Sequence, residues 1–389
     1  MKKSLVLMAM AGVALASCVG NEVEEITPKK ELSKIQFAAP MTYDNVETRR
    51  VPGEIVSGLN SYPTDETFVV FGKKYTDLDY PGWASSKLIW GTAENPSTVV
   101  KYNPDLSGWE PIDSEGNYKS YYWNTDMKAA FAAVSPSQLN SEATITFDDD
   151  NGFIISDFQV EGTAKEQYDL MYSTLSTNVT TSNQTHHGYS GTIILFHHAL
   201  SSLRFAIVGD KEAVLTGLAV HNVKDKGTFT QNNPTPWALD ENSKGNWDIY
   251  KDITVNFTES PQFILDLLNK QNAYKEQGYK EAKNFLMIPQ TLTNSSTEFN
   301  PNTDPHLEVY YTDKNHVKQV SVVPLADFFG GTWNQGTRHI YILSLGGSSK
   351  IFFAPGVDSW LELEHDEVIQ LDAYHDDEHV TNNGSDAND

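Results

Sequence analysis

The feature that most constrains this chain is a series of short segments in which apolar and polar residues alternate, each ended by turn-forming residues. They lie at 34–38, 67–72, 143–147, 203–208, 307–311, 339–343 and 351–353. Because successive side chains of a strand point to opposite faces of a sheet, this alternation is typical of strands with one buried face. Many such strands and little helix favour an all-β chain built of packed sandwiches.

The acidic stretch 148–152 has two interpretations. It ends in Asn151-Gly152, which suits a hairpin turn that requires positive φ. Calcium binding is the alternative for its three aspartates. The spacing, however, lacks the alternating ligands and the glutamate at position twelve of an EF-hand loop. We therefore predict a turn.

One segment departs from the strand pattern and predicts a helix. Ser260 is suited to cap a helix, and Pro261 is suited to its first position. Apolar residues then recur at helical spacing, at Phe263, Ile264, Leu267 and Leu268. Elsewhere, the Ser/Thr/Asn-rich stretch 173–192 is the best candidate for a junction between two domains.

The N-terminus has the organisation of a signal peptide at residues 1–17. Lys2 and Lys3 precede an apolar run that is too short to span a bilayer. The string Leu15-Ala16-Ser17-Cys18 resembles a bacterial lipobox, in which the cysteine is acylated and becomes the new first residue. The polar segment 18–33 then predicts a lipidated, flexible tether, and the chain is expected to be an outer-membrane lipoprotein.

The charge of the chain limits its partners. Its 389 residues carry a formal net charge of −24, and removal of the leader with Lys2 and Lys3 makes this −26. Such an acidic protein has no electrostatic footprint for nucleic acid and is repelled by anionic lipid head groups. Acyl chains on Cys18 would hold it at a membrane instead. Cys18 is the sole cysteine, so packed cores rather than disulfides must stabilise the fold.

The sequence has no recognisable catalytic, cofactor or metal site. It lacks a P-loop, a dinucleotide fingerprint and an HExxH motif, and 188–191 lacks the spacing of a nucleophile elbow. His186-His187 and His197-His198 invite a zinc interpretation. Adjacent residues of a strand point to opposite faces, so each pair supplies at most one ligand to a given site. One packed and one solvated imidazole per pair is the simpler interpretation, and we expect no enzyme, cofactor or metal.

Several sequence blocks follow one another between about residues 35 and 360. They include Ile35-Gln36-Phe37, Thr48-Arg49, Tyr122-Trp123-Asn124 and the stretches 131–136, 198–205, 285–290 and 350–360. In this order the blocks resemble those of the fimbrillin-like proteins, or type V pilins, which are exported as lipoproteins. The resemblance implies two transthyretin-like β-sandwich domains, assigned to residues 34–190 and 191–362, and leaves an acidic tail at 363–389.

The resemblance also implies assembly by strand exchange. In such pilins the precursor's first strand fills a groove in its own sheet. An arginine-specific protease removes that strand, and an extended segment from a neighbouring subunit takes its place. Here the removable strand would lie within 34–50, with Ile35, Phe37 and Ala39 on one face. A donated strand would satisfy both the unpaired backbone groups and the apolar groove.

The cleavage site would follow Arg49 or Arg50. The Val51-Pro52 that follows Arg50 hinders cleavage there, so Arg49 is favoured. A solvated arginine pair without a processing role is the alternative interpretation.

A short segment of the acidic tail repeats the apolar pattern of the first strand. Ile369, Leu371 and Ala373 match the alternating positions of Ile35, Phe37 and Ala39. This tail segment is a candidate donor strand. An edge strand of the chain's own last sheet explains the alternation equally well.

These expectations predict a structural or accessory subunit of a cell-surface fimbria. Its partners would be other fimbrial subunits, an arginine-specific protease and, through lipid, the outer membrane. The alternative is a tip adhesin or surface lipoprotein that binds a glycan, or a host or bacterial surface ligand, with Trp83, Trp90 or Trp109 stacking on sugars. An enzyme on a sandwich scaffold is the third hypothesis, and no constellation of residues supports it.

Overall fold

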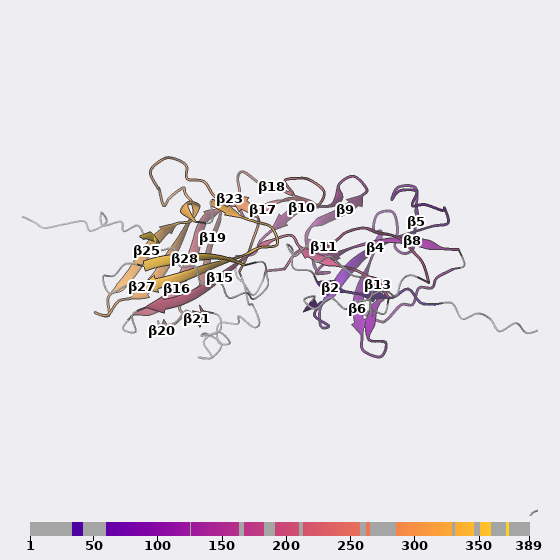
Figure 1. Cartoon of the computed structure of the whole chain (residues 1–389), viewed down its shortest axis with the longest axis horizontal. Helices are drawn as coiled ribbons and strands as arrows, with labels where there is room; N and C mark the ends of the chain where they lie inside the picture. The colour runs from indigo at the N-terminus through magenta and orange to yellow at the C-terminus, as the bar shows by residue number, and fades with distance from the viewer. Residues whose placement is uncertain are drawn as a thin grey trace, which may run out of the picture.

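In the structure, a computed structural model, the regular secondary structure is almost entirely β-strand, as the sequence predicts. It describes residues 33–41, 60–124, 126–162, 167–182, 191–209, 213–256, 262–264, 285–328, 331–345, 351–358 and 371–372. Helix α1 (Leu139–Glu142) and the 3₁₀ helix η1 (Leu325–Asp327) are single turns. Figure 1 shows an elongated molecule with sheets at both ends. Among the described residues, no helix is long and apolar enough to cross a membrane.

The N-terminal half is organised around a twelve-stranded sheet, whose main path runs β13-β1-β7-β6-β4-β8-β11-β14-β2-β3. The strands are β1 (Phe37–Ala38), β2 (Pro40–Met41), β3 (Asn60–Ser61), β4 (Thr67–Tyr75), β5 (Lys87–Leu88), β6 (Ser97–Asn103), β7 (Gly108–Pro111), β8 (Lys128–Ser135), β11 (Met171–Ser173), β12 (Ser176–Val179), β13 (Thr192–Ile193) and β14 (Phe196–His198). Off the path, β12 pairs with β8 and β5 pairs with β4.

Strand β4 is apolar on both faces because each face packs into a different core. Phe68 and Val70 belong to one cluster of buried side chains, which also contains the first strand. Val69 and Phe71 belong to a second cluster on the opposite face. A four-stranded sheet of order β18-β17-β10-β9 contributes the other wall of this second core. Its strands are β9 (Thr144–Asp148), β10 (Gly152–Gln159), β17 (Lys226–Thr230) and β18 (Trp237–Leu239).

The stretch 148–152 forms the predicted hairpin turn between β9 and β10. Asp148 Oδ1 accepts hydrogen bonds from the backbone N–H groups of Asp150 and Asn151, at 2.9 and 2.7 Å. Gly152 has a φ of +65°, which favours glycine, and it pairs with Asp148 across the hairpin. The carboxylate of Asp148 is thus used to close the turn.

The C-terminal half packs two sheets face to face. One has the path β21-β15-β27-β28-β29 with β22 beside β15, and the other has the path β19-β16-β24-β25 with β20 beside β16. The strands are β15 (Ser201–Gly209), β16 (Val214–Val223), β19 (Gly245–Tyr250), β20 (Val255–Asn256), β21 (Gln262–Phe263), β22 (Phe285–Met287), β24 (His306–Thr312), β25 (Lys318–Pro324), β27 (Arg338–Leu345), β28 (Ile351–Asp358) and β29 (Leu371–Asp372). A small sheet pairs β23 (Gln290–Thr291) with β26 (Thr332–Trp333).

The predicted start of the helix at Ser260 is wrong. Gln262 and Phe263 form strand β21, which pairs with Ile207 and Ala206 of β15. Backbone pairing to an available strand therefore prevails over the local helix signals. Ile264 is the helical residue here and is fully buried, and the remainder of the predicted helix lies outside the described residues.

Hydrogen-bonded sheets cross the predicted domain boundary between residues 190 and 191. Strands β13 and β14 follow that boundary in the sequence but belong to the twelve-stranded sheet. Strand β17 pairs with β10, joining residues on both sides of the boundary. The pairings link residues on the two sides of the predicted boundary, and the two domain ranges stay a prediction.

Candidate functional site

The first strand occupies an internal position of the twelve-stranded sheet. Phe37 pairs antiparallel with Trp109 of β7 on one side and parallel with Thr192 of β13 on the other. Just before it, Lys34 forms an antiparallel bridge to Tyr122. We call residues 33–41 the first-strand segment, and we call the space that they fill between β7 and β13 the groove.

Backbone hydrogen bonds hold the first-strand segment along both sides of the groove. They are Ile35 N–H to Tyr121 O at 2.8 Å, Trp123 N–H to Ser33 O at 2.9 Å, Thr192 N–H to Gln36 O at 2.7 Å, Ile194 N–H to Ala38 O at 2.7 Å and Tyr62 N–H to Ala39 O at 3.0 Å. Removal of the segment would leave four N–H groups without these acceptors.

The three residues predicted to share a face all point into one aromatic core. Ile35, Phe37 and Ala39 are 1%, 0% and 6% exposed. The Phe37 ring lies 5.2 Å from that of Phe131 and 6.2 Å from that of Trp90, edge to face in both cases. The first strand is therefore an integral part of this core.

The first-strand segment also closes the sheet. Strands β1 and β2 are successive parts of it, and β13 and β14 are successive parts of residues 192–198. Strand β1 pairs with β13, and Phe196 of β14 pairs with Met41 of β2. The two ends of the strand order thus meet at this segment, and its removal would leave β7 with an unpaired edge.

Two further contacts tie the first-strand segment to its surroundings. Lys34 Nζ lies 3.4 Å from the carboxylate of Glu110, which is 2% exposed and also accepts a hydrogen bond from Asn103 at 2.7 Å. Gly191 has a φ of +103°, and a Cβ there would lie 2.6 Å from the carbonyl carbon of Gln36. A glycine at this position lets β13 approach the first strand closely.

The candidate donor strand is described only in part. Leu371 and Asp372 form β29, which pairs antiparallel with Phe353 and Phe352 of β28. These two residues end the described strand order of that sheet, and both interpretations of the tail's alternation stay open. Ile369 and Ala373 lie outside the described residues.

The predicted processing sites, Cys18, Arg49 and Arg50, also lie outside the described residues. The three tryptophans considered for sugar stacking are buried instead. Trp83, Trp90 and Trp109 are 7%, 4% and 5% exposed and belong to the N-terminal cores. None of them presents an open ring face of the kind that a sugar ring requires.

The histidine pair 197–198 is split between two faces of β14, as predicted. His198 is buried and its Nδ1 lies 2.9 Å from Asp169, while His197 is half-buried and stacks on Tyr172 at 5.7 Å. The pair His186-His187 lies outside the described residues.

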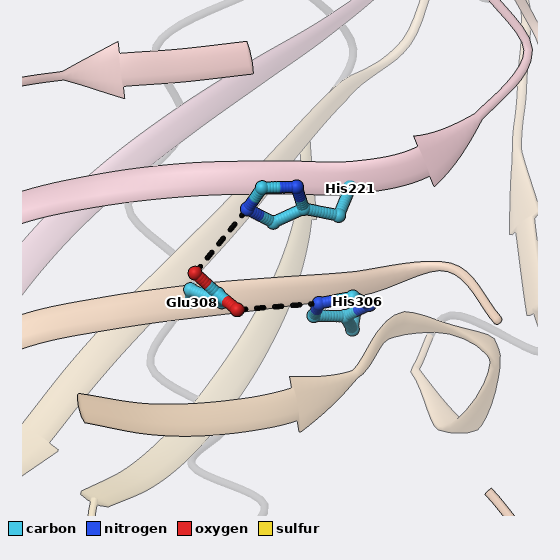
Figure 2. Close-up of side chains that lie close together, drawn as sticks. All are labelled: His221, His306 and Glu308. Atoms are coloured by element: carbon cyan, nitrogen blue, oxygen red, sulfur yellow. Dashed lines mark ion pairs between the residues drawn. The ribbon is translucent and has the colours of Figure 1, made fainter. Parts of the chain in front are cut away.

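A cluster that the sequence interpretation missed lies on the C-terminal half. Figure 2 shows His221 of β16 converging with His306 and Glu308 of β24. One ligand atom from each residue lies within 4.8 Å of the other two, which makes this a candidate metal site. The spacing His306-x-Glu308 is the signal that was available, because residues two apart share a face of a strand.

The charges of this cluster are complementary. The close contacts that Glu308 makes with His221 and His306 lower the pKa of its carboxyl below the ordinary value. The same contact with Glu308 raises the pKa of His221. The Tyr310 hydroxyl donates a hydrogen bond to Glu308 Oε2 and orients the carboxylate.

Comparisons with known proteins point to one family. The family model described as fimbrillin-like matches residues 89–360. The fold is similar to that of a fimbrial protein from Bacteroides vulgatus, with a TM-score of 0.51 and 17% identity over 84% of this chain and 99% of that one. The tip fimbrial protein Mfa3 from Porphyromonas gingivalis matches with a TM-score of 0.36 and 10% identity over 84% and 99% of the two chains. A search of curated proteins gives no match.

Proposed function

The chain belongs to the fimbrillin-like family, and we propose that it is a structural or accessory subunit of a cell-surface fimbria that assembles by strand exchange. The observation that carries this proposal is the seating of the first-strand segment between two strands, with Ile35 and Phe37 buried in an aromatic core. No other short segment of the described chain both precedes the fold and completes it.

Strand exchange would be driven by the apolar core and the backbone N–H groups that are exposed when the first-strand segment is removed. Loss of Ile35 and Phe37 from the core would forfeit about 3–6 kcal/mol of burial. The freed N–H groups of Trp123, Thr192 and Ile194 would need water or a new strand. A donated strand with apolar residues at alternate positions restores both contributions, which is the physical basis of β-augmentation.

In this proposal the acyl chains on Cys18 and the first-strand segment leave the subunit in the same fragment. Acylation of Cys18 would deliver the precursor to the outer membrane, and a cut after Arg49 by an arginine-specific protease would release residues 18–49. That fragment contains both the acylated cysteine and the whole first-strand segment. One cleavage would therefore free the subunit from the membrane and open its groove.

The tail is the donor in this proposal. Among the described residues, it pairs within the chain through Leu371 with Phe353 and Asp372 with Phe352. Within the described part of the chain, β29 pairs with one strand only, whereas the groove offers hydrogen bonds on both sides and a core position for a large apolar side chain. The tail would therefore gain contacts on transfer to the opened groove of the next subunit.

The proposal is tested with the full-length chain and an arginine-specific protease. Polymers, detected by native electrophoresis and electron microscopy, are expected only after cleavage. The double variant Arg49→Lys, Arg50→Lys keeps the charge but resists this protease, so it should stay monomeric. A chain truncated after Glu367 should be cleaved yet remain monomeric.

Two results would contradict the proposal. Polymers of normal length from the truncated chain would eliminate the tail as donor. A cleaved wild-type chain that keeps its first-strand segment and never polymerises would eliminate strand exchange altogether.

A further inference from the structure

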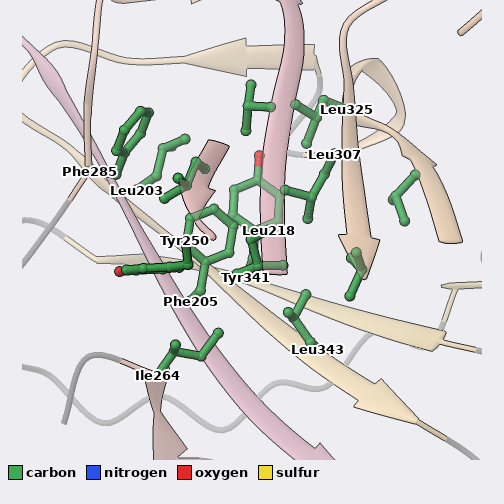
Figure 3. Close-up of a cluster of buried hydrophobic side chains, with 14 of the residues drawn as sticks. Leu203, Phe205, Leu218, Tyr250, Ile264, Phe285, Leu307, Leu325, Tyr341 and Leu343 are labelled. Carbon is green, nitrogen blue, oxygen red and sulfur yellow. The ribbon is translucent and has the colours of Figure 1, made fainter. Parts of the chain in front are cut away.

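The histidines of the cluster meet because two neighbouring strands are in register. His221 of β16 pairs directly with His306 of β24, and their rings stack with centroids 5.0 Å apart. Glu308 lies two residues after His306, on the same face. Leu307 between them points to the opposite face, where it is fully buried in the C-terminal core, as Figure 3 shows. The cluster therefore lies on the face of this sheet that points away from the C-terminal core.

A β-bulge directs His221 toward its partners. The pairing of β16 with β19 shifts register between Val220 and Val223, and Asn222 within the bulge has a φ of +58°. The Asn222 side chain donates hydrogen bonds to Pro301 O at 2.9 Å and Asp304 O at 3.1 Å. Bulges of this kind re-aim side chains and are enriched next to functional sites.

The hydrogen bonds of the two imidazoles leave both Nε2 atoms facing the carboxylate. His306 Nδ1 lies 2.8 Å from the carbonyl oxygen of Asp304, so it carries the proton and donates. His221 Nδ1 lies 3.3 Å from Asn246 Oδ1, and the backbone N–H of Asn222 also donates to that oxygen, which fixes the orientation of the amide. His221 Nε2 is buried and makes no well-aligned hydrogen bond with the described residues.

Two distances between donor atoms are close to the spacing of ligands around a tetrahedral ion. His221 Nε2 lies 3.3 Å from Glu308 Oε2, and His306 Nε2 lies 3.6 Å from Glu308 Oε1. Zinc bonds to nitrogen and oxygen are about 2.0–2.1 Å, so neighbouring ligands of a tetrahedral ion are about 3.3 Å apart. These two distances involve different oxygens of Glu308, and one ligand atom from each of the three residues lies within 4.8 Å of the other two, so the three donors would draw closer together around one ion.

Outer contacts already hold the donors in place. Outer hydrogen-bond partners are characteristic of metal-ligating histidines and carboxylates. His306 is held by the Asp304 carbonyl, which also accepts a hydrogen bond from Asn222, and Glu308 is held by the Tyr310 hydroxyl. The Asp304 carboxylate in turn accepts backbone N–H groups of Ser295 and Asn300, each at 2.8 Å, and so fixes the loop beside the cluster.

We propose that His221, His306 and Glu308 form a binding site for a divalent transition-metal ion, with Zn²⁺ as the best match. Two imidazoles and one carboxylate suit zinc, whereas Ca²⁺ and Mg²⁺ require mainly oxygen ligands. The side chains of His221 and Glu308 are each 24% exposed, so water completes the coordination from the solvent side. The bound ion joins β16 to β24 on the outside of the C-terminal sandwich and stabilises it.

The test uses the metal alone and the full-length chain after treatment with a chelator. Isothermal titration with Zn²⁺ is expected to give one site per chain that Ca²⁺ does not fill. His221→Asn and His306→Asn keep an amide N–H near the position of Nδ1 but lack Nε2, and Glu308→Gln keeps the shape of the carboxylate. Each is expected to weaken Zn²⁺ binding by at least about tenfold, since loss of even an outer partner costs about 10–100-fold.

Two further variants test whether Zn²⁺ binds at this cluster and not at another histidine. His316→Asn removes an exposed histidine with a φ of +62°, a conformation that asparagine tolerates, and should leave Zn²⁺ affinity unchanged. Tyr310→Phe removes only the hydroxyl that orients Glu308 and should reduce affinity by about 10–100-fold. It cannot remove a ligand, so its effect reports on positioning.

Visible absorption of Co²⁺ in place of Zn²⁺ provides a second measurement, because a tetrahedral site gives intense bands. Equal Zn²⁺ affinity in the wild type and the His221→Asn, His306→Asn double variant would overturn the proposal. So would the absence of Zn²⁺ binding by the folded wild-type chain, which would leave the cluster as an ion-paired triad without a metal.

Discussion

The substitution Phe37→Ala tests whether the first-strand segment is an energetic part of the N-terminal core. Phe37 is completely buried and packs edge to face against Phe131 and Trp90. Truncation of such a phenylalanine costs about 3–5 kcal/mol, from lost burial and from the cavity that remains. That is a large part of the roughly 5–15 kcal/mol that separates folded from unfolded domains.

Urea denaturation of the full-length chain, followed by tryptophan fluorescence, measures this cost. Gln36→Ala is the matched control, because Gln36 is only half-buried and its carbonyl bond to Thr192 N–H does not depend on the side chain. The control should cost well under about 1 kcal/mol. If Phe37→Ala and Gln36→Ala destabilise the chain equally, the segment is not held by its side chains and the reasoning fails.

The same substitution predicts how firmly a cleaved segment is held. A loss of about 3–5 kcal/mol corresponds to weaker retention by a factor of roughly 10² to 4 × 10³, at 1.4 kcal/mol per tenfold. After cleavage at Arg49, the Phe37→Ala segment should therefore leave the subunit much faster than the wild-type segment. Size-exclusion chromatography with mass spectrometry of the released peptide measures this difference.

Two further substitutions test the groove and a buried histidine. Gly191→Ala should cost at least about 1 kcal/mol more than Gly116→Ala, because both glycines have positive φ but only Gly191 would place a Cβ against the backbone of Gln36. Equal costs in urea denaturation would show that close approach is unimportant. Burial lowers the pKa of His339 to about 4, so the unfolded chain binds an extra proton as the pH falls below about 6.5. The free energy of unfolding should therefore fall by up to about 3 kcal/mol between pH 6.5 and 4. His339→Gln keeps an acceptor for the Asn334 N–H and should lose this part of the pH dependence; an identical pH dependence would contradict the assignment.

Much of the fold could be predicted from local patterns because alternation is a direct consequence of strand geometry. Ile35, Phe37 and Ala39 were predicted to share a face, and all three are buried in one core. The turn at Asn151-Gly152 was predicted from the need for positive φ, which Gly152 adopts. Both signals lie within a few residues of one another, so no long-range information is needed.

The features that the sequence did not predict depend on partners that are distant in the sequence. Gln262 and Phe263 carry helix signals, yet they pair with a strand more than fifty residues earlier in the chain. The His221–Glu308 cluster joins two strands whose register no local pattern reveals. Only the His306-x-Glu308 half of that cluster was visible in the sequence.

Assembly by strand exchange requires that the first-strand segment is removed before the subunit joins a fibre. The N-terminus of subunits taken from isolated fimbriae, determined by intact-mass measurement and N-terminal sequencing, tests it most directly. We expect a start at Arg50, or at Val51 if the second arginine is the cleavage site, with no lipid. An acylated Cys18 at the start of every polymerised subunit would contradict it.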